Sequence, residues 1–102
     1  MDKRRPHYDL VSIKAIFSTV DGLRITVTSL TFATLELGLS EEGIVALVQS
    51  IERTHFYKSM TSIRDHRIWQ DVYHLPFEAR VLYVKFTTDE TGYLLISLKD
   101  KT

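Results

Sequence analysis

The side chains best suited to chemistry on a charged substrate gather in one stretch of this sequence, residues 55–73, HFYKSMTSIRDHRIWQDVY. The stretch combines cations, imidazoles and flat rings: Lys58, Arg64, Arg67, His55, His66, Phe56, Tyr57, Trp69 and Tyr73. Lys and Arg neutralise phosphates and aromatic rings stack on bases, so this combination favours nucleic acid as the ligand. The alternative interpretation is a pair of ordinary strands with solvated charges on one face, and composition alone does not decide between the two.

The four histidines allow two kinds of site. His7, His55, His66 and His74 fall on separate predicted elements, without recurring ligand spacing and without a carboxylate pair, so we predict no metal site. A histidine pair acting as acid and base, as in pancreatic-type ribonucleases, is a stronger alternative, with His7 and His66 as its candidates. We rank this pair below a site built from Tyr and Lys, because most lone histidines are surface or hydrogen-bonded residues. No spacing supports a Ser-His-Asp or Cys-His arrangement.

Composition bounds the class of protein. The chain has 102 residues, 44% of them apolar and 25% charged, which indicates one globular domain over residues 1–102. It has no Cys for disulfides or thiolate metal sites, and no apolar run fits a signal peptide or a membrane span. We therefore expect a cytoplasmic protein without a membrane partner. The net charge is zero, but the charges are unevenly distributed: residues 36–52 contain four Glu and no Lys or Arg, and residues 53–67 contain four Lys or Arg and one Asp. Such a separation of charge would steer nucleic acid to one side of the protein.

The elements that must position these side chains follow a simple order, helices first and strands afterwards. We predict three helices, one over residues 9–19, one capped by Thr28-Ser29 and ending at Gly38, and one capped by Ser40. The second helix carries Leu30, Phe32 and Leu35, and the third buries Ile44, Leu47, Val48 and Ile51. A short extended piece is expected over residues 23–26, and strands over residues 55–62, 67–74, 79–88 and 93–100, with Pro76 in a turn. This order predicts an α+β fold with N-terminal helices packed on one face of a largely antiparallel sheet.

The last two predicted strands are the clearest part of the pattern. One face is apolar, and the other carries Tyr83, Lys85, Ser97 and Lys99 and must face water or a ligand. If residues 90–92 form the loop between these two strands, the numbers of any two residues that lie directly opposite each other add up to the same value. Phe86 then lies opposite Ile96, Val84 opposite Leu98, and Tyr83 opposite Lys99. We therefore predict that Tyr83 and Lys99 are neighbours on an exposed face, where an ordinary solvated Tyr–Lys contact is the alternative to a site.

Several motifs in this chain resemble those of one known family. They are FYKSM, a DH followed by IWQDVY, the opening KR-x-PH (Lys3, Arg4, Pro6 and His7), VLYVKF and the closing SLKDK. With these motifs the chain resembles the MqsR toxins, the motility quorum-sensing regulator branch of the bacterial RelE-like endoribonucleases. The resemblance runs nearly end to end and is weakest in the helical middle. It implies a RelE-like toxin fold.

The resemblance also implies an activity. MqsR-type toxins of type II toxin–antitoxin systems cut messenger RNA without a metal or other cofactor, preferring a GC-containing triplet, and so arrest translation and growth, with links to biofilms and persistence. The implied partner is an MqsA-type antitoxin that carries zinc and a DNA-binding helix-turn-helix, so we expect no direct DNA binding by this chain alone. We expect the antitoxin to dock at an exposed sheet edge. The alternative is a noncatalytic nucleic-acid- or protein-binding module that uses the same basic face.

By the same resemblance, four motifs supply the catalytic residues. FYKSM supplies Lys58, IWQDVY supplies Gln70, VLYVKF supplies Tyr83, and SLKDK supplies Lys99. We expect the two lysines to hold the scissile phosphate, Gln70 to position a base or ribose, and Tyr83 to transfer a proton with a phenol made more acidic by a nearby ammonium.

Further residues are candidates for binding RNA, and the orientation of two of the four catalytic candidates stays open. Secondary RNA-binding candidates are Arg64, Arg67, Lys85, His66, His7 and Tyr57. Strict alternation places Lys58 in phase with Phe56 and Met60, and Gln70 in phase with Ile68 and Val72. Either that face is mixed or the strands are irregular.

Overall fold

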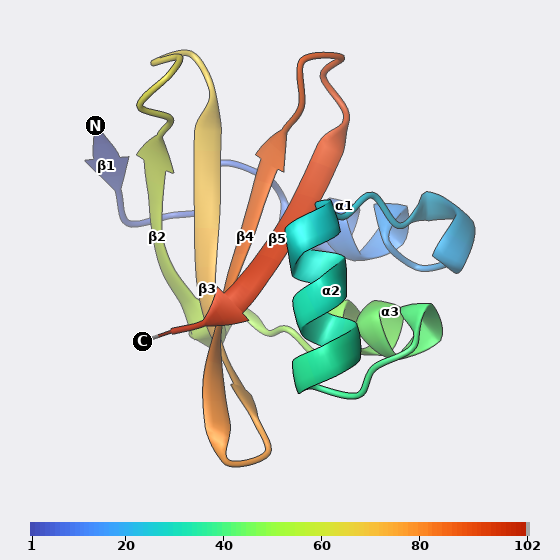
Figure 1. Cartoon of the computed structure of the whole chain (residues 1–102). Coiled ribbons are helices and arrows are strands. Elements are labelled where there is room, and N and C mark those ends of the chain that lie inside the picture. Colours follow the sequence, from blue (N-terminus) through green and yellow to red (C-terminus); the bar gives the residue numbers. More distant parts are fainter. Residues whose placement is uncertain (102) are drawn as a thin grey trace.

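In the computed structural model of the chain, which describes residues 1–101, the strands form one antiparallel sheet in the order β1-β2-β3-β4-β5. The strands are β1 (Asp2–Lys3), β2 (Phe56–Thr61), β3 (Trp69–Phe77), β4 (Arg80–Thr88) and β5 (Leu94–Asp100). The helices are α1 (Leu10–Ile16), α2 (Val27–Glu36) and α3 (Glu41–Gln49), with short 3-10 turns η1 (Val20–Gly22) and η2 (Arg53–His55). Figure 1 shows the three helices gathered beside β5, at the end of the sheet away from β1. The predicted α+β class and antiparallel sheet are confirmed.

Side-chain caps set the helix starts. Asp9 accepts a hydrogen bond from the backbone N–H of Ser12 and begins α1, and Ser40 accepts one from Gly43 and begins α3, both as predicted. Helix α1 ends at Ile16, earlier than the predicted residue 19. The hydroxyl of Thr19 accepts from the N–H of Gly22, so this residue begins the η1 turn instead of continuing the helix.

Helix α2 corrects two expectations. Its cap is Thr26, whose hydroxyl accepts from the N–H of Ser29, so the predicted cap at Thr28-Ser29 is wrong. Ser29 is buried instead, and its hydroxyl accepts from the N–H of Leu98 on β5 at 2.9 Å. The helix therefore turns its small residues, Ser29 and Ala33, towards the sheet, and Leu35 is left 75% exposed.

The core lies between the helices and one face of the sheet. Helices α1 and α3 contribute a buried stripe, and the sheet contributes alternate residues of its central strands: Ile13, Phe17, Ile44, Leu47, Val48, Ile51, Tyr73, Leu75, Leu82, Val84, Phe86, Ile96 and Leu98. The rings of Phe17 and Phe86 meet across this layer, 5.8 Å apart between centroids. The predicted stripe on α3 is confirmed, and the opposite face of the sheet is left uncovered by helices.

The β4–β5 hairpin has the predicted register. Phe86 pairs with Ile96, Val84 with Leu98, and Tyr83 with Lys99. Gly92 adopts φ 86°, the left-handed conformation that a glycine tolerates in a short hairpin loop.

Strand β3 is longer than predicted. It runs to Phe77 and includes Pro76, which pairs with Val81 and does not lie in a turn. Pairing between β2 and β3 stops at Tyr73, so Pro76 occupies a part of β3 that pairs with β4 alone, where a missing N–H is tolerated. The chain instead reverses at Glu78, whose φ is 52°.

Strand β2 contains the irregularity that alternation left open. Phe56 pairs with Tyr73 and Lys58 pairs with Val72, so the register shifts by one residue between them and Tyr57 is the extra residue of a β-bulge. Because of the bulge, Phe56 faces the core while Lys58 projects from the opposite face. Strict alternation would have placed these two side chains on the same face.

The outer edge of β5 is partly covered. The backbone N–H of Ile96 donates to the carbonyl of Arg24 at 2.9 Å, and the N–H of Thr26 donates to the carbonyl of Ile96. This extended piece before α2 confirms the prediction for residues 23–26. Among residues 1–101, every helix is too short or too polar to cross a bilayer.

Candidate active site

The uncovered side of the sheet, called the open face below, carries the sequence-predicted catalytic residues. Directly paired residues of an antiparallel sheet project to the same side. One row across the sheet therefore consists of Lys58, Val72, Lys85 and Ser97. The next row consists of His74, Tyr83 and Lys99. Five side chains that can carry charge or a proton, Lys58, Lys85, His74, Tyr83 and Lys99, thus lie on adjacent strands.

Tyr83 and Lys99 are neighbours, as the register predicts. The ammonium of Lys99 lies 5.1 Å from the centroid of the Tyr83 ring. The pKa of the Tyr83 phenol is raised above its usual value, mainly by burial, although the Lys58 ammonium acts in the opposite direction. The expectation of a more acidic phenol is therefore wrong, because burial outweighs the nearby charge. Tyr83 keeps its proton at neutral pH and can donate it.

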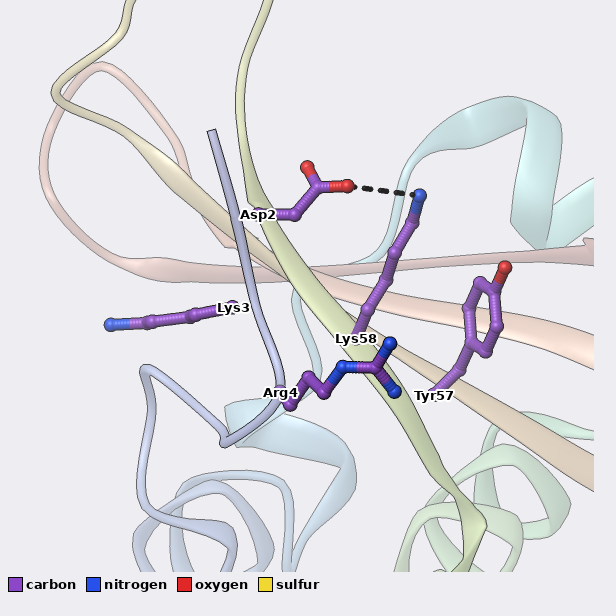
Figure 2. A pocket seen from close by; sticks show the side chains of 5 residues that line it. All are labelled: Asp2, Lys3, Arg4, Tyr57 and Lys58. Atoms are coloured by element: carbon purple, nitrogen blue, oxygen red, sulfur yellow. Dashed lines mark hydrogen bonds and ion pairs between the residues drawn. The ribbon is translucent and has the colours of Figure 1, made fainter.

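Lys58 meets a carboxylate from the first strand. Its ammonium lies 3.4 Å from the carboxylate of Asp2, beside a hollow of about 310 Å³ that Arg4 and Tyr57 also line. Figure 2 shows Arg4, Tyr57 and Lys58 close together, with Lys3 pointing away on the other side of β1. The N-terminal segment therefore brings both an acid, Asp2 of β1, and an additional cation, Arg4, to this part of the open face.

His74 is the residue of the open face that sequence reasoning missed. It lies opposite Tyr83, with the two rings 6.0 Å apart, and stacks on Tyr57 at 4.2 Å between centroids. Burial, with a smaller contribution from Lys101, lowers the pKa of its imidazole. A turn placed at residues 78–79 of the β3–β4 hairpin would have predicted that His74 lies opposite Tyr83, because the numbers of opposed residues in this hairpin also add up to one value.

Gln70 shares the open face but lies at the other end of it. It pairs with Met60 and is two positions along β3 from Val72. From His74 it is about 13 Å along the strand, at roughly 3.3 Å per residue. Val72, between them, is fully buried although it lies on this face. The open face is therefore mixed, which answers the question that alternation left for Gln70.

Three of the secondary candidates lie in the loop between β2 and β3. Arg64, His66 and Arg67 are exposed there, beyond the last pair of the β2–β3 ladder. The side chain of Arg67 binds Asp65 at 2.9 Å and lowers the pKa of that carboxyl to about 2. The structure does not bring this loop cluster into contact with Tyr83 and Lys99.

His7 lies on the helix-bearing side of the sheet. Its ring stacks on Trp69 at 5.4 Å, and its backbone N–H donates to the buried carboxylate of Asp71. Burial, together with the charge of Lys3, lowers the pKa of its imidazole. The sheet therefore separates His7 from Tyr83, and the structure does not bring His7 and His66 together as an acid–base pair. Residues 1–101 contain no group of three or more His, Cys, Asp or Glu side chains placed to hold a metal ion.

The arrangement is suited to a phosphodiester. Lys58 and Lys99 can balance the charge of a phosphate from two sides, and the protonated phenol of Tyr83 can donate to an oxygen between them. Fixed positive charge of this kind stabilises the additional negative charge of a transition state at phosphorus.

Comparison with known proteins identifies the family. A family model described as "Motility quorum-sensing regulator, toxin of MqsA" matches residues 5–100. The chain belongs to the MqsR toxin family. A curated MqsR relative, the mRNA interferase toxin MqsR of Escherichia coli (strain K12), is 37% identical over 101 residues, covering 99% of this chain and 100% of the relative. The MqsR resemblance predicted from the motifs is thus confirmed.

Proposed function

We propose that this chain is the toxin of a type II toxin–antitoxin system and an endoribonuclease that cleaves messenger RNA to arrest translation and growth. The name of the Escherichia coli relative supports the activity, and the family description supports the toxin role. The observation that carries the site is the pairing of Tyr83 with Lys99 on the open face, within electrostatic reach of Lys58. A noncatalytic binding surface has no need of a protonated phenol between two ammonium groups.

The residues act in named roles. The ribose 2′-OH loses its proton to water and attacks the adjacent phosphorus, the bond to the 5′ oxygen breaks, and a cyclic phosphate remains on the upstream fragment. Lys58 and Lys99 hold the phosphoryl oxygens, and Tyr83 gives its proton to the departing 5′ oxygen. Gln70, further along the same face, orients a base or ribose of the bound strand.

The partner is an antitoxin of the MqsA type, with zinc and a helix-turn-helix in the partner and not in this chain. The middle of the β5 edge is already bonded to residues 24–29, so the β1 side is the edge available for another strand. The site of action is the cytoplasm, where messenger RNA is translated, and the preferred target contains a GC triplet.

Two substitutions test the site. Tyr83→Phe and Lys99→Ala should each leave the fold and antitoxin binding intact and slow cleavage of messenger RNA by roughly 10²- to 10⁴-fold, the usual contribution of a positioned acid or of a transition-state charge partner. Cleavage is measured with purified protein in excess EDTA, where the wild type should keep its rate, and growth arrest is measured on expression without the antitoxin.

Matched substitutions elsewhere provide the controls. Tyr93→Phe removes an exposed phenol from the β4–β5 loop, and Lys14→Ala removes a cation from α1, so both should cleave like the wild type. Full activity of Tyr83→Phe or Lys99→Ala would contradict the proposed site. RNA binding without any cleavage, combined with tolerated expression, would instead favour a noncatalytic binding module.

A further inference from the structure

A second hollow, about 300 Å³ in volume, adjoins the proposed active site. Its floor is the open face of β4 and β5, with Tyr83, Lys85, Ser97 and Lys99, and its wall is the start of α2, with Thr28. Tyr83 and Lys99 therefore belong both to the candidate active site and to this neighbouring space. The roles proposed above leave Lys85, Ser97 and Thr28 without a function.

Lys85 is a half-buried cation of this region. It lies in the row between Val72 and Ser97. The ion pairs among residues 1–101 involve other cations: Arg24, Lys58, Arg67 and Arg80. Burial and the neighbouring Lys99 lower the pKa of the Lys85 ammonium. A half-buried ammonium beside a second one is costly in free energy unless an anion joins them.

The lining of the hollow has the donors that such an anion needs. Ser97 lies directly opposite Lys85, and Thr28 faces them from α2, so each contributes a hydroxyl. None of the described residues that line this hollow is acidic. The hollow around Lys58, by contrast, contains the carboxylate of Asp2. The space beside Lys85 is therefore open to a group with several oxygens and negative charge.

We propose that this hollow binds the phosphate next to the scissile one in the RNA chain, so that the protein holds two consecutive phosphates. The proposal rests on the endoribonuclease function and adds a subsite to it. Lys85 and Tyr83 are two positions apart on β4, about 6.6 Å at the usual rise of a strand, which is of the order of one step along an extended single strand of RNA. Lys99 lies between the two phosphates and contacts both.

The experiment uses a short single-stranded RNA with one mapped cleavage site and three versions of its backbone. One version is natural, and the others carry a neutral methylphosphonate at the linkage immediately upstream or immediately downstream of the scissile phosphate. On the natural RNA, Lys85→Ala should lower kcat/KM roughly tenfold, the usual effect of losing one charge-assisted contact. The slope of log kcat/KM against log salt concentration should become shallower by about 0.7, as for one fewer phosphate contact.

The modified RNAs provide the decisive comparison. On one of the two methylphosphonate substrates, the wild type should lose about as much activity as Lys85→Ala loses on natural RNA. Lys85→Ala should cleave that same modified substrate as fast as it cleaves natural RNA. Ser97→Ala should show the same pattern with a smaller loss. Lys101→Ala removes an exposed cation from the adjoining chain and should cleave all three substrates like the wild type.

The outcomes separate this subsite from the proposed function. If Lys85→Ala loses equally on all three substrates, Lys85 acts at the scissile phosphate and the subsite is refuted, while the endoribonuclease function stands. An unchanged rate in Lys85→Ala also refutes it. If the wild type cleaves none of the RNAs, the proposed function itself fails, whereas normal cleavage by Tyr83→Phe would refute only the proposed site.

Discussion

Lys58 is bound to a carboxylate of its own chain before any RNA arrives. Its ammonium lies 3.4 Å from Asp2, and both side chains are partly exposed to water. An exposed pair of this kind stabilises a protein by only about 0.2–1 kcal/mol. A phosphate can therefore displace Asp2 at small cost, but it must do so in order to use Lys58 fully.

Replacing this acid tests the competition. Asp2→Asn should tighten binding of a non-cleavable RNA by up to about fivefold, because a cost of at most about 1 kcal/mol is removed. The measurement is a binding titration at low salt. Asp21→Asn is the control, since it removes an equal charge from the exposed η1 turn. Weaker binding by Asp2→Asn would mean that the ion pair positions Lys58 and does not compete for it.

At the scale of elements, the β4–β5 hairpin sets the relation between Tyr83 and Lys99. Its loop closes through the N–H of Gly92, which donates to the carbonyl of Asp89 at 3.0 Å. Asp89 also accepts from Arg24 and from Thr91, and these contacts lower the pKa of its carboxyl. The loop therefore anchors the register of both strands to the segment before α2.

The conformation of Gly92 makes a second test. Gly92→Ala should destabilise the protein by roughly 1–2 kcal/mol, because an L-residue with a positive φ is strained. For a chain of this size the melting temperature should fall by about 4–8 °C per kcal/mol. Glu90→Ala, an exposed change in the same loop, should leave it nearly unchanged. An unaltered melting temperature in Gly92→Ala would contradict the role of this loop in setting the register.

Local chemistry explains which elements were predictable from sequence. The caps of α1 and α3 and the register of the β4–β5 hairpin depend on neighbouring residues, and these predictions are confirmed. The cap of α2 was misplaced because Ser29 is occupied by a bond to β5, a contact distant in sequence. Pro76 and the β2 bulge also depend on long-range pairing.

The same distinction applies to the candidate site. The pair of Tyr83 and Lys99 followed from hairpin geometry. The place of Lys58 and Gln70 on the open face did not follow from the sequence. Strict alternation put Lys58 on the same face as Phe56, which points to the core, and put Gln70 in phase with the apolar Ile68 and Val72. His74 was overlooked for the same reason, since its position depends on where β3 ends.

At the scale of the whole molecule, a buried carboxylate joins the N-terminal segment to the sheet. Asp71 accepts hydrogen bonds from the backbone N–H groups of His7 and Tyr8 and from the hydroxyl of Ser59. His7 is thereby held against Trp69 on one side of the sheet, while His74 is held between Tyr57 and Tyr83 on the other. Each imidazole has a pKa below its usual value.

This arrangement predicts that acid weakens the fold. A lowered pKa means that the folded state disfavours the charged imidazole. The stabilisation is therefore complete above about pH 6.5, the unfolded value, and is lost as the pH falls through the lower folded values. The free energy of unfolding in urea should decline between pH 7 and pH 5, where Asp65 and Asp89 are still ionised because their own pKa values are lowered. His7→Gln and His74→Gln should each flatten the decline, and an unaltered slope in both variants would rule out this explanation.

The bulge at Tyr57 has a consequence for how this strand tolerates insertions and deletions. On its upstream side an even-numbered residue, Phe56, points to the core, whereas downstream of it the even-numbered Lys58 points to the open face. At the bulge, even-numbered residues of β2 change from the core face to the open face, and the position of the bulge therefore decides which face each motif residue points to. A substitution leaves each side chain on its own face of the strand, but one added or deleted residue moves the following side chains to the opposite face. One residue added or deleted between η2 and the loop after β2 would therefore turn the side chains beyond it to the other face of the sheet, whereas a substitution leaves their faces unchanged.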